Sequence, residues 1–168
     1  MRILGIDPGM AITGYGLVDS NDDQPRLIDC GALTTPARVP ITERLRTLYL
    51  KLVDLIALYQ PTEVAIEEPF VAKNVRSALA VGQARAVAIL AAANAGLPVY
   101  EYTPNQVKRS IANYGHSGKE QVQEMVRLQL ELATPPQPYD AADALAIALC
   151  HIWESRLARL IAHSEERK

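Results

Sequence analysis

The sequence predicts a single α/β domain in which a mixed β-sheet is covered by helices on both faces. Two observations favour this class. Strand-like and helical segments follow one another in the order β-β-β-α-β-α-β-α, and a chain of 168 residues, 49% of them apolar, suffices to bury one core. No internal repeat or linker divides the chain. We therefore expect one domain over residues 1–162 and a charged, frayed tail at 163–168.

The first half of the chain predicts four strands and one helix. Three apolar runs separated by turn-rich pieces form a meander, and a fourth run follows the helix: RILGI at 2–6, TGYGLVD at 13–19, LIDCGALTT at 27–35 and TEVAIEEPF at 62–70. Between the third and fourth runs, apolar residues recur at three- and four-residue steps from Ile41 to Tyr59, which is the period of an α-helix. Gln60 and Pro61 end this helix.

The second half predicts a mainly helical arrangement with one more strand. The elements, in order, are a helix from about Asn74 to Ala95, a strand at 97–102, helical pieces at 105–112 and 118–133, and a helix from Tyr139 to about Ala162. Gly96 ends the alanine-rich helix, and the breaker TPPQP precedes the last one. The fifth strand completes a five-stranded sheet.

The composition argues against disulfide-rich, zinc-binding and membrane-spanning proteins. Two lone cysteines, Cys30 and Cys150, indicate neither a disulfide framework nor a zinc site. Gln83 and Arg85 interrupt the most apolar helix, and the first residues lack a signal-peptide pattern, so we expect a cytoplasmic protein without membrane contact.

The net charge of −2 is unevenly distributed along the chain. From Lys73 to Lys119 there are six basic residues and one acidic residue. This stretch is either a solvated surface or a surface that meets phosphates, and its basic residues Lys73, Arg76, Lys108 and Arg109 are the candidate phosphate contacts.

Three segments place carboxylates at the edges of predicted elements. Asp7 ends the first strand before the turn Pro-Gly, Glu67 and Glu68 end the fourth strand before a proline, and Asp140 and Asp143 open the last helix three residues apart. Turn chemistry and helix capping are the ordinary explanations for each segment alone. Because successive strand residues point to opposite faces, only one of Glu67 and Glu68 can share a pocket with Asp7, and the alternation does not choose between them.

Together the acidic residues point to metal chemistry. Carboxylates that converge without comparable basic partners repel one another unless a hard cation lies among them, and oxygen is the ligand that Mg²⁺ prefers. Two such ions, on the order of 4 Å apart, clamp the attacking and leaving oxygens of a phosphodiester displacement. The sequence therefore predicts a Mg²⁺ site with two ions, in which Mn²⁺ could substitute.

Five segments that span nearly the whole chain carry a resemblance to a known family. They are GIDPGMAITGYG, AIEEPFVAKNVRSALAVGQARAVA, PVYEYTPNQVK, GKEQVQEMV and DAADALAIALCH. The sequence resembles the RuvC family of bacterial Holliday junction resolvases, endonucleases with a ribonuclease H-like fold that nick opposed strands of four-way DNA junctions. Ala86 is a small departure, because relatives often have glycine there.

The resemblance implies roles for individual residues. It selects Glu67 over Glu68 and assigns metal binding and catalysis to four acids, Asp7, Glu67, Asp140 and Asp143. It also places Phe70 near the junction centre and Lys108 and Lys119 near the scissile phosphate, with Lys119 counted as catalytic.

The predicted activity also indicates partners, and two other functions are compatible with the sequence pattern. Two strands must be cut in one encounter, so we expect a homodimer, and the small residues Ala78, Gly82, Ala86 and Ala93 suggest the alanine-rich helix as its contact. The resemblance also implies cooperation with the RuvA-RuvB branch-migration complex. The rivals are a sugar-kinase or actin-like ATPase, which also begins with an Ile-Asp-x-Gly turn, and a non-catalytic junction-binding protein of the same fold.

Overall fold

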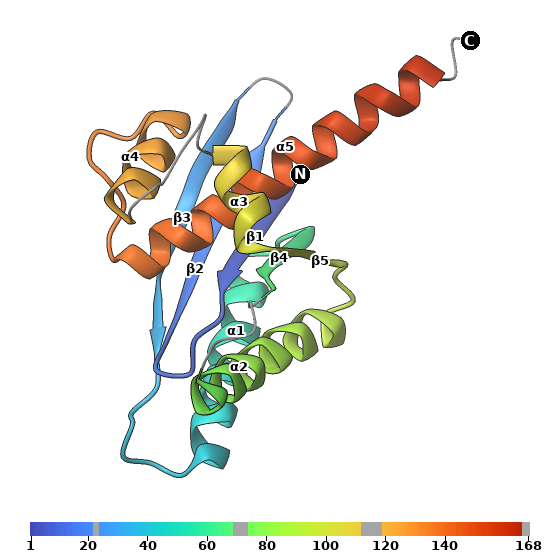
Figure 1. Ribbon diagram of the computed structural model, residues 1–168. Helices are drawn as coiled ribbons and strands as arrows, with labels where there is room; N and C mark the ends of the chain where they lie inside the picture. The colour runs from blue at the N-terminus through green and yellow to red at the C-terminus, as the bar shows by residue number, and fades with distance from the viewer. Residues whose placement is uncertain (22–23, 69–73, 112–118, 166–168) are drawn as a thin grey trace.

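A five-stranded mixed sheet forms the centre of the molecule (Figure 1). The computed structural model describes residues 1–21, 24–68, 74–111 and 119–165. The strands are β1 Arg2–Asp7, β2 Ile12–Ser20, β3 Pro25–Thr34, β4 Glu63–Glu67 and β5 Val99–Tyr102; the helices are α1 Ile41–Tyr59, α2 Val75–Asn94, α3 Pro104–Ile111, α4 Lys119–Gln129 and α5 Tyr139–Glu165. The element order is the predicted one, and α5 extends beyond its expected end near Ala162.

The spatial order of the strands is β3-β2-β1-β4-β5. The meander of β1, β2 and β3 is antiparallel, whereas β4 and β5 join β1 in parallel. Parallel pairing needs a helical crossover, which α1 and α2 provide. The carboxyl ends of β1 and β4 therefore lie side by side at one edge of the sheet.

Helices cover both faces of the sheet, as the sequence predicts. On one face, Leu48 and Leu52 of α1 and Ala84 and Ala88 of α2 form a buried cluster with Leu4 and other sheet residues. On the other face, α5 lies across the sheet with α3 and α4 beside it, and its apolar residues form a second buried cluster (Figure 1). The predicted fold class is confirmed.

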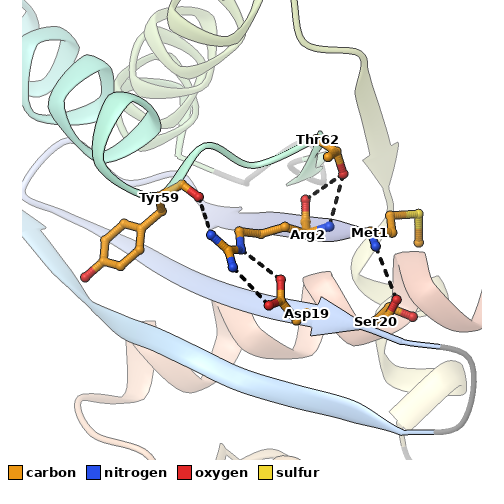
Figure 2. A network of polar contacts seen from close by, with 6 residues as sticks. All are labelled: Met1, Arg2, Asp19, Ser20, Tyr59 and Thr62. Carbon is orange, nitrogen blue, oxygen red and sulfur yellow. Dashed lines mark hydrogen bonds and ion pairs between the residues drawn. The ribbon is translucent and has the colours of Figure 1, made fainter.

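A polar network fixes the amino-terminal end of β1 (Figure 2). The guanidinium of Arg2 donates to both carboxylate oxygens of Asp19 at 2.8 and 3.0 Å and to the carbonyl of Tyr59 at 2.6 Å. The Arg2 backbone N–H donates to the hydroxyl of Thr62, and that hydroxyl donates to the Arg2 carbonyl. The network joins β1 to β2 and to the connection between α1 and β4, so β1 is held at the end opposite Asp7.

Glycines let α5 lie directly on the backbone of the sheet. A Cβ atom at Gly5 of β1 would lie 2.1 Å from the Ala144 carbonyl oxygen, and one at Gly14 of β2 would lie 1.9 Å from the Asp140 carbonyl oxygen. Any side chain at these positions would push the helix away. The first two turns of α5 are therefore positioned by backbone contact with β1 and β2.

The helix α2 departs from one expectation. Its length and hydropathy are sufficient to cross a membrane, although Gln83 and Arg85 were expected to rule this out. Ala84, Ala88, Ala91 and Ala92 are buried against the rest of the fold, but only 22% of the apolar window is buried. Val87 and Ile89 are partly buried against the same cluster, whereas Val75, Leu79 and Leu90 are exposed.

Candidate active site

Three of the predicted carboxylates line one cavity of about 260 Å³ at the carboxyl ends of β1 and β4. Asp7 is the last residue of β1, Glu67 the last of β4, and Asp143 lies in the second turn of α5. All three are half-buried. Segments separated by more than 130 residues in the chain are thus brought to one cavity.

The sheet register explains why Glu67 reaches the cavity. Gly5 pairs with Ala65 and Ile6 with Ile66 in the parallel ladder of β1 and β4, so the next residues, Asp7 and Glu67, lie side by side on the face that α5 covers. Glu68 follows the strand and is exposed, and its backbone N–H donates to the Tyr102 carbonyl at 2.8 Å. Among the residues described, Glu68 is not part of the cavity lining.

The first helical turns of α5 carry the remaining acids. Asp143 faces the cavity, whereas Asp140, one turn earlier and also half-buried, is not among the described residues that line it. The backbone contact of Asp140 with Gly14 sets the position of this turn. Asp140 therefore remains a predicted ligand.

Two helices form the opposite wall of the cavity. The lining from α3 and α4 is mostly apolar and includes one cation and one amide: Pro104, Val107, Lys108, Ile111, Gln121, Val122 and Met125. The start of α3 is held by a capping box, in which Thr103 N–H donates to the Gln106 side-chain oxygen at 2.8 Å and Gln106 N–H donates to the Thr103 hydroxyl at 3.3 Å. This cap fixes the helix that carries Lys108.

Negative charge accumulates in the cavity. Burial and the neighbouring Asp143 carboxylate raise the pKa of Glu67, and Lys108 partly opposes this shift. A divalent cation would relieve the repulsion, and carboxylate oxygens are suitable ligands for it. As the side chains stand, the described residues contain no cluster of three His, Cys, Asp or Glu groups able to hold a metal ion. Ion binding would therefore require these carboxylates to reorient.

The predicted basic residues have different surroundings. Lys108 and Arg109 lie exposed in the last turn of α3, and Arg76 is exposed in the first turn of α2. Arg85, from the same basic stretch, forms an ion pair with Glu101. Phe70, Lys73 and the side chain of Lys119 lie outside the described residues; the backbone of Lys119 begins α4.

Sequence reasoning missed two groups of residues near this site. The α4 residues Gln121 and Met125 gave no signal of their own, because their place depends on how α4 packs beside α3. His151 of α5 is buried and hydrogen-bonded to Glu63 and Tyr102. The sequence pattern alone assigned it no role beyond its place in an apolar helix. Its place in DALAIALCH, a lone imidazole in an apolar run, was the available signal.

Comparisons with known proteins show which family the chain resembles. Residues 3–151 match the family model described as crossover junction endodeoxyribonuclease RuvC. A protein of that name from Dehalococcoides mccartyi is 53% identical over 165 residues, covering 98% of this chain and 99% of the relative, and one from Chloroflexus aggregans is 58% identical over 153 residues, covering 91% and 93%. The structure of Thermus thermophilus RuvC in complex with a Holliday junction substrate superposes with a TM-score of 0.85 at 36% identity, covering 94% of this chain and 96% of that one.

Proposed function

Because the chain belongs to the RuvC family of crossover junction endodeoxyribonucleases, we propose that it resolves four-way DNA junctions by hydrolysing phosphodiesters at the cavity of Asp7, Glu67 and Asp143. The observation that carries this proposal is the convergence of three carboxylates from distant segments beside an exposed lysine. A ribonuclease H-like sheet, with its two central parallel strands ending at the site, supports the same assignment.

We propose Mg²⁺ as the cofactor, with two ions per site and Mn²⁺ as a substitute. Asp7, Glu67, Asp140 and Asp143 would hold the ions, because their side chains supply only oxygen ligands, which Mg²⁺ prefers. When bound, the ions supply Lewis-acid polarisation of the phosphate and a more acidic water.

The protein's own groups supply positioning and charge. Lys108 lies at the cavity and can orient the scissile phosphate as a point charge, and we assign the exposed Arg109 and Arg76 to neighbouring phosphates. We assign Lys119, at the start of α4, to the negative charge that develops during cleavage, and Phe70 and Lys73 to the junction itself. The apolar wall from α3 and α4 limits water at the reacting centre.

We further propose that the enzyme acts as a homodimer through α2. Val75, Leu79, Gly82, Ala86 and Leu90 recur at three- and four-residue steps and form one stripe. Val75 is 81% exposed, Leu79 62% and Leu90 52%, and a Cβ atom at Gly82 would have no neighbour within 4 Å. Contact between two such stripes would bury this apolar surface and place two sites about a two-fold axis, matching the symmetry of a junction.

Family membership supports two more proposals. The enzyme would work with the RuvA-RuvB branch-migration complex, and it would do so in the bacterial cytoplasm, where the chromosome lies. Neither proposal is needed for the chemistry at the cavity.

The deciding experiment compares DNA substrates and metals. The protein is incubated with end-labelled four-way junction, plain duplex or RNA-DNA hybrid, with Mg²⁺, Mn²⁺ or a chelator. We expect paired, symmetric nicks in the junction alone, and only with metal. If the protein bound the junction but cut it with neither metal, it would instead be a non-catalytic junction-binding protein of the same fold.

A further inference from the structure

A buried polar relay joins α5 to β4 and β5. The ring of His151, 1% exposed, lies between two partners: its Nδ1 is 2.7 Å from the Tyr102 hydroxyl and its Nε2 is 2.6 Å from the Glu63 carboxylate. The ring of Tyr100 lies over the imidazole, with centroids 4.5 Å apart. Each ring nitrogen of His151 therefore has a partner.

The partners constrain the protons of the relay. The Glu63 carboxylate accepts hydrogen bonds, so Nε2 of His151 is the donor to it. Burial raises the pKa of Tyr102 above its usual range, so the phenol keeps its proton. The Tyr102 hydroxyl, which can donate or accept, forms the second hydrogen bond with Nδ1.

The relay connects the elements that carry the active-site carboxylates. Glu63 begins β4 and Glu67 ends it, both on the face covered by α5. Tyr102 is the register partner of Glu67, and the next residue, Thr103, caps α3. His151 lies eight residues after Asp143 on α5, or about two helical turns.

We propose that His151 is a positioning residue for the nuclease site. Its two hydrogen bonds set the placement of α5 along β4 and β5, and thereby the separation of Asp143 from Glu67. This inference rests on the proposed function, because the carboxylates need a fixed spacing only if they act together on metal and phosphate.

The choice of a polar residue here fits a positioning role. A buried polar pair is often no more stable than apolar residues of similar volume, and in some proteins it fixes one arrangement where apolar packing allows several. Leucine would fill much of the same space, but it would not fix the position of α5 relative to β4 and β5. Glutamine can supply both the donor to Glu63 and the acceptor for Tyr102.

The test compares His151→Leu with His151→Gln. Single-turnover cleavage of a four-way junction is measured, together with Mn²⁺ affinity of the DNA-free protein by electron paramagnetic resonance, junction affinity, and thermal unfolding. For His151→Leu we expect losses of about tenfold or more in rate and in Mn²⁺ affinity, with junction affinity unchanged. For His151→Gln we expect a cleavage rate and an Mn²⁺ affinity within about threefold of the wild type, because glutamine can keep both hydrogen bonds. If His151 only filled space, the two variants would lose similar amounts.

Tyr102→Phe keeps the inference testable if His151→Leu does not fold. It removes one hydroxyl and should lower rate and Mn²⁺ affinity in the same direction. A folded Leu or Phe variant with wild-type rate and Mn²⁺ affinity would overturn the proposal, as would equal losses in His151→Gln and His151→Leu. If the wild type failed to cut junctions, the proposed function would fail, while the Mn²⁺ comparison would still decide the role of the relay.

Discussion

The close contact between β2 and α5 makes Gly14→Ala the most informative substitution in the scaffold. The added Cβ atom would lie 1.9 Å from the Asp140 carbonyl oxygen, whereas ordinary contacts begin at 3.4 Å. The first turn of α5 must therefore move by about 1.5 Å. A displacement of about 1 Å at a reacting centre can cost on the order of 100-fold in rate, so we expect a loss of at least that size.

The assay is single-turnover cleavage of a labelled four-way junction at saturating Mg²⁺. Gly14→Ala should bind the junction with near wild-type affinity, because neither Gly14 nor the moved turn carries the predicted basic contacts. The rate constant for cleavage should fall, and raising the Mg²⁺ concentration should restore only part of it.

Gly96→Ala is the matched control. Gly96 has a φ of +70° and open space around its Cβ position, so alanine there is strained without a clash. The strain costs about 1–2 kcal/mol of stability but leaves α5 in place. We expect a lower melting temperature and an unchanged cleavage rate at 25 °C. A folded Gly14→Ala protein that cuts at the wild-type rate would refute the argument that backbone contact positions the site.

Four further predictions concern the proposed residues. Glu67→Gln should abolish most cleavage and keep junction binding, while Glu68→Gln should be nearly silent; the reverse pattern in a cleavage assay would show that the other face is used. Because the pKa of Glu67 is raised in the folded state, its ionisation destabilises the fold as pH rises above the usual carboxyl range. Glu67→Gln should therefore melt higher than the wild type at pH 7 without metal, with the gain disappearing below about pH 4; scanning calorimetry with no such gain would contradict this. Gly82→Arg should give folded monomers that nick junctions singly or not at all, and sedimentation showing a fully active dimer would remove α2 from the interface. Lys119→Ala should lower the single-turnover rate more than the junction affinity, and equal losses would make it a simple phosphate contact.

The order of the elements and the sheet were predictable because local patterns determine them. Apolar periodicity identified α1, and Gly96 marked the end of α2. The strand pattern did not allow a choice between Glu67 and Glu68, because both residues lie at the end of the same strand. That choice depends on the ladder in which Gly5 pairs with Ala65, a contact between segments 60 residues apart.

The wall of the cavity and the hydrogen bonds of His151 could not be predicted from the sequence either, because they also depend on contacts between distant segments. Val122 and Met125 line the cavity of the carboxylates only because α4 packs beside α3 and α5. His151 meets Glu63 across 88 residues of sequence. The ion pair of Arg85 with Glu101 was equally out of reach, although both residues had been counted in the charge of this stretch.

The place of α5 in the chain has a consequence for synthesis of the protein. This last helix contacts β1, β2, β3 and β4, and it brings Asp143 to a site whose first member is Asp7. A nascent chain can fold its first hairpins while the face above Gly5 and Gly14 remains bare. A chain interrupted before Tyr139 would lack Asp140 and Asp143, two of the four predicted metal ligands. Such a fragment could form the sheet and still not assemble the predicted set of carboxylates.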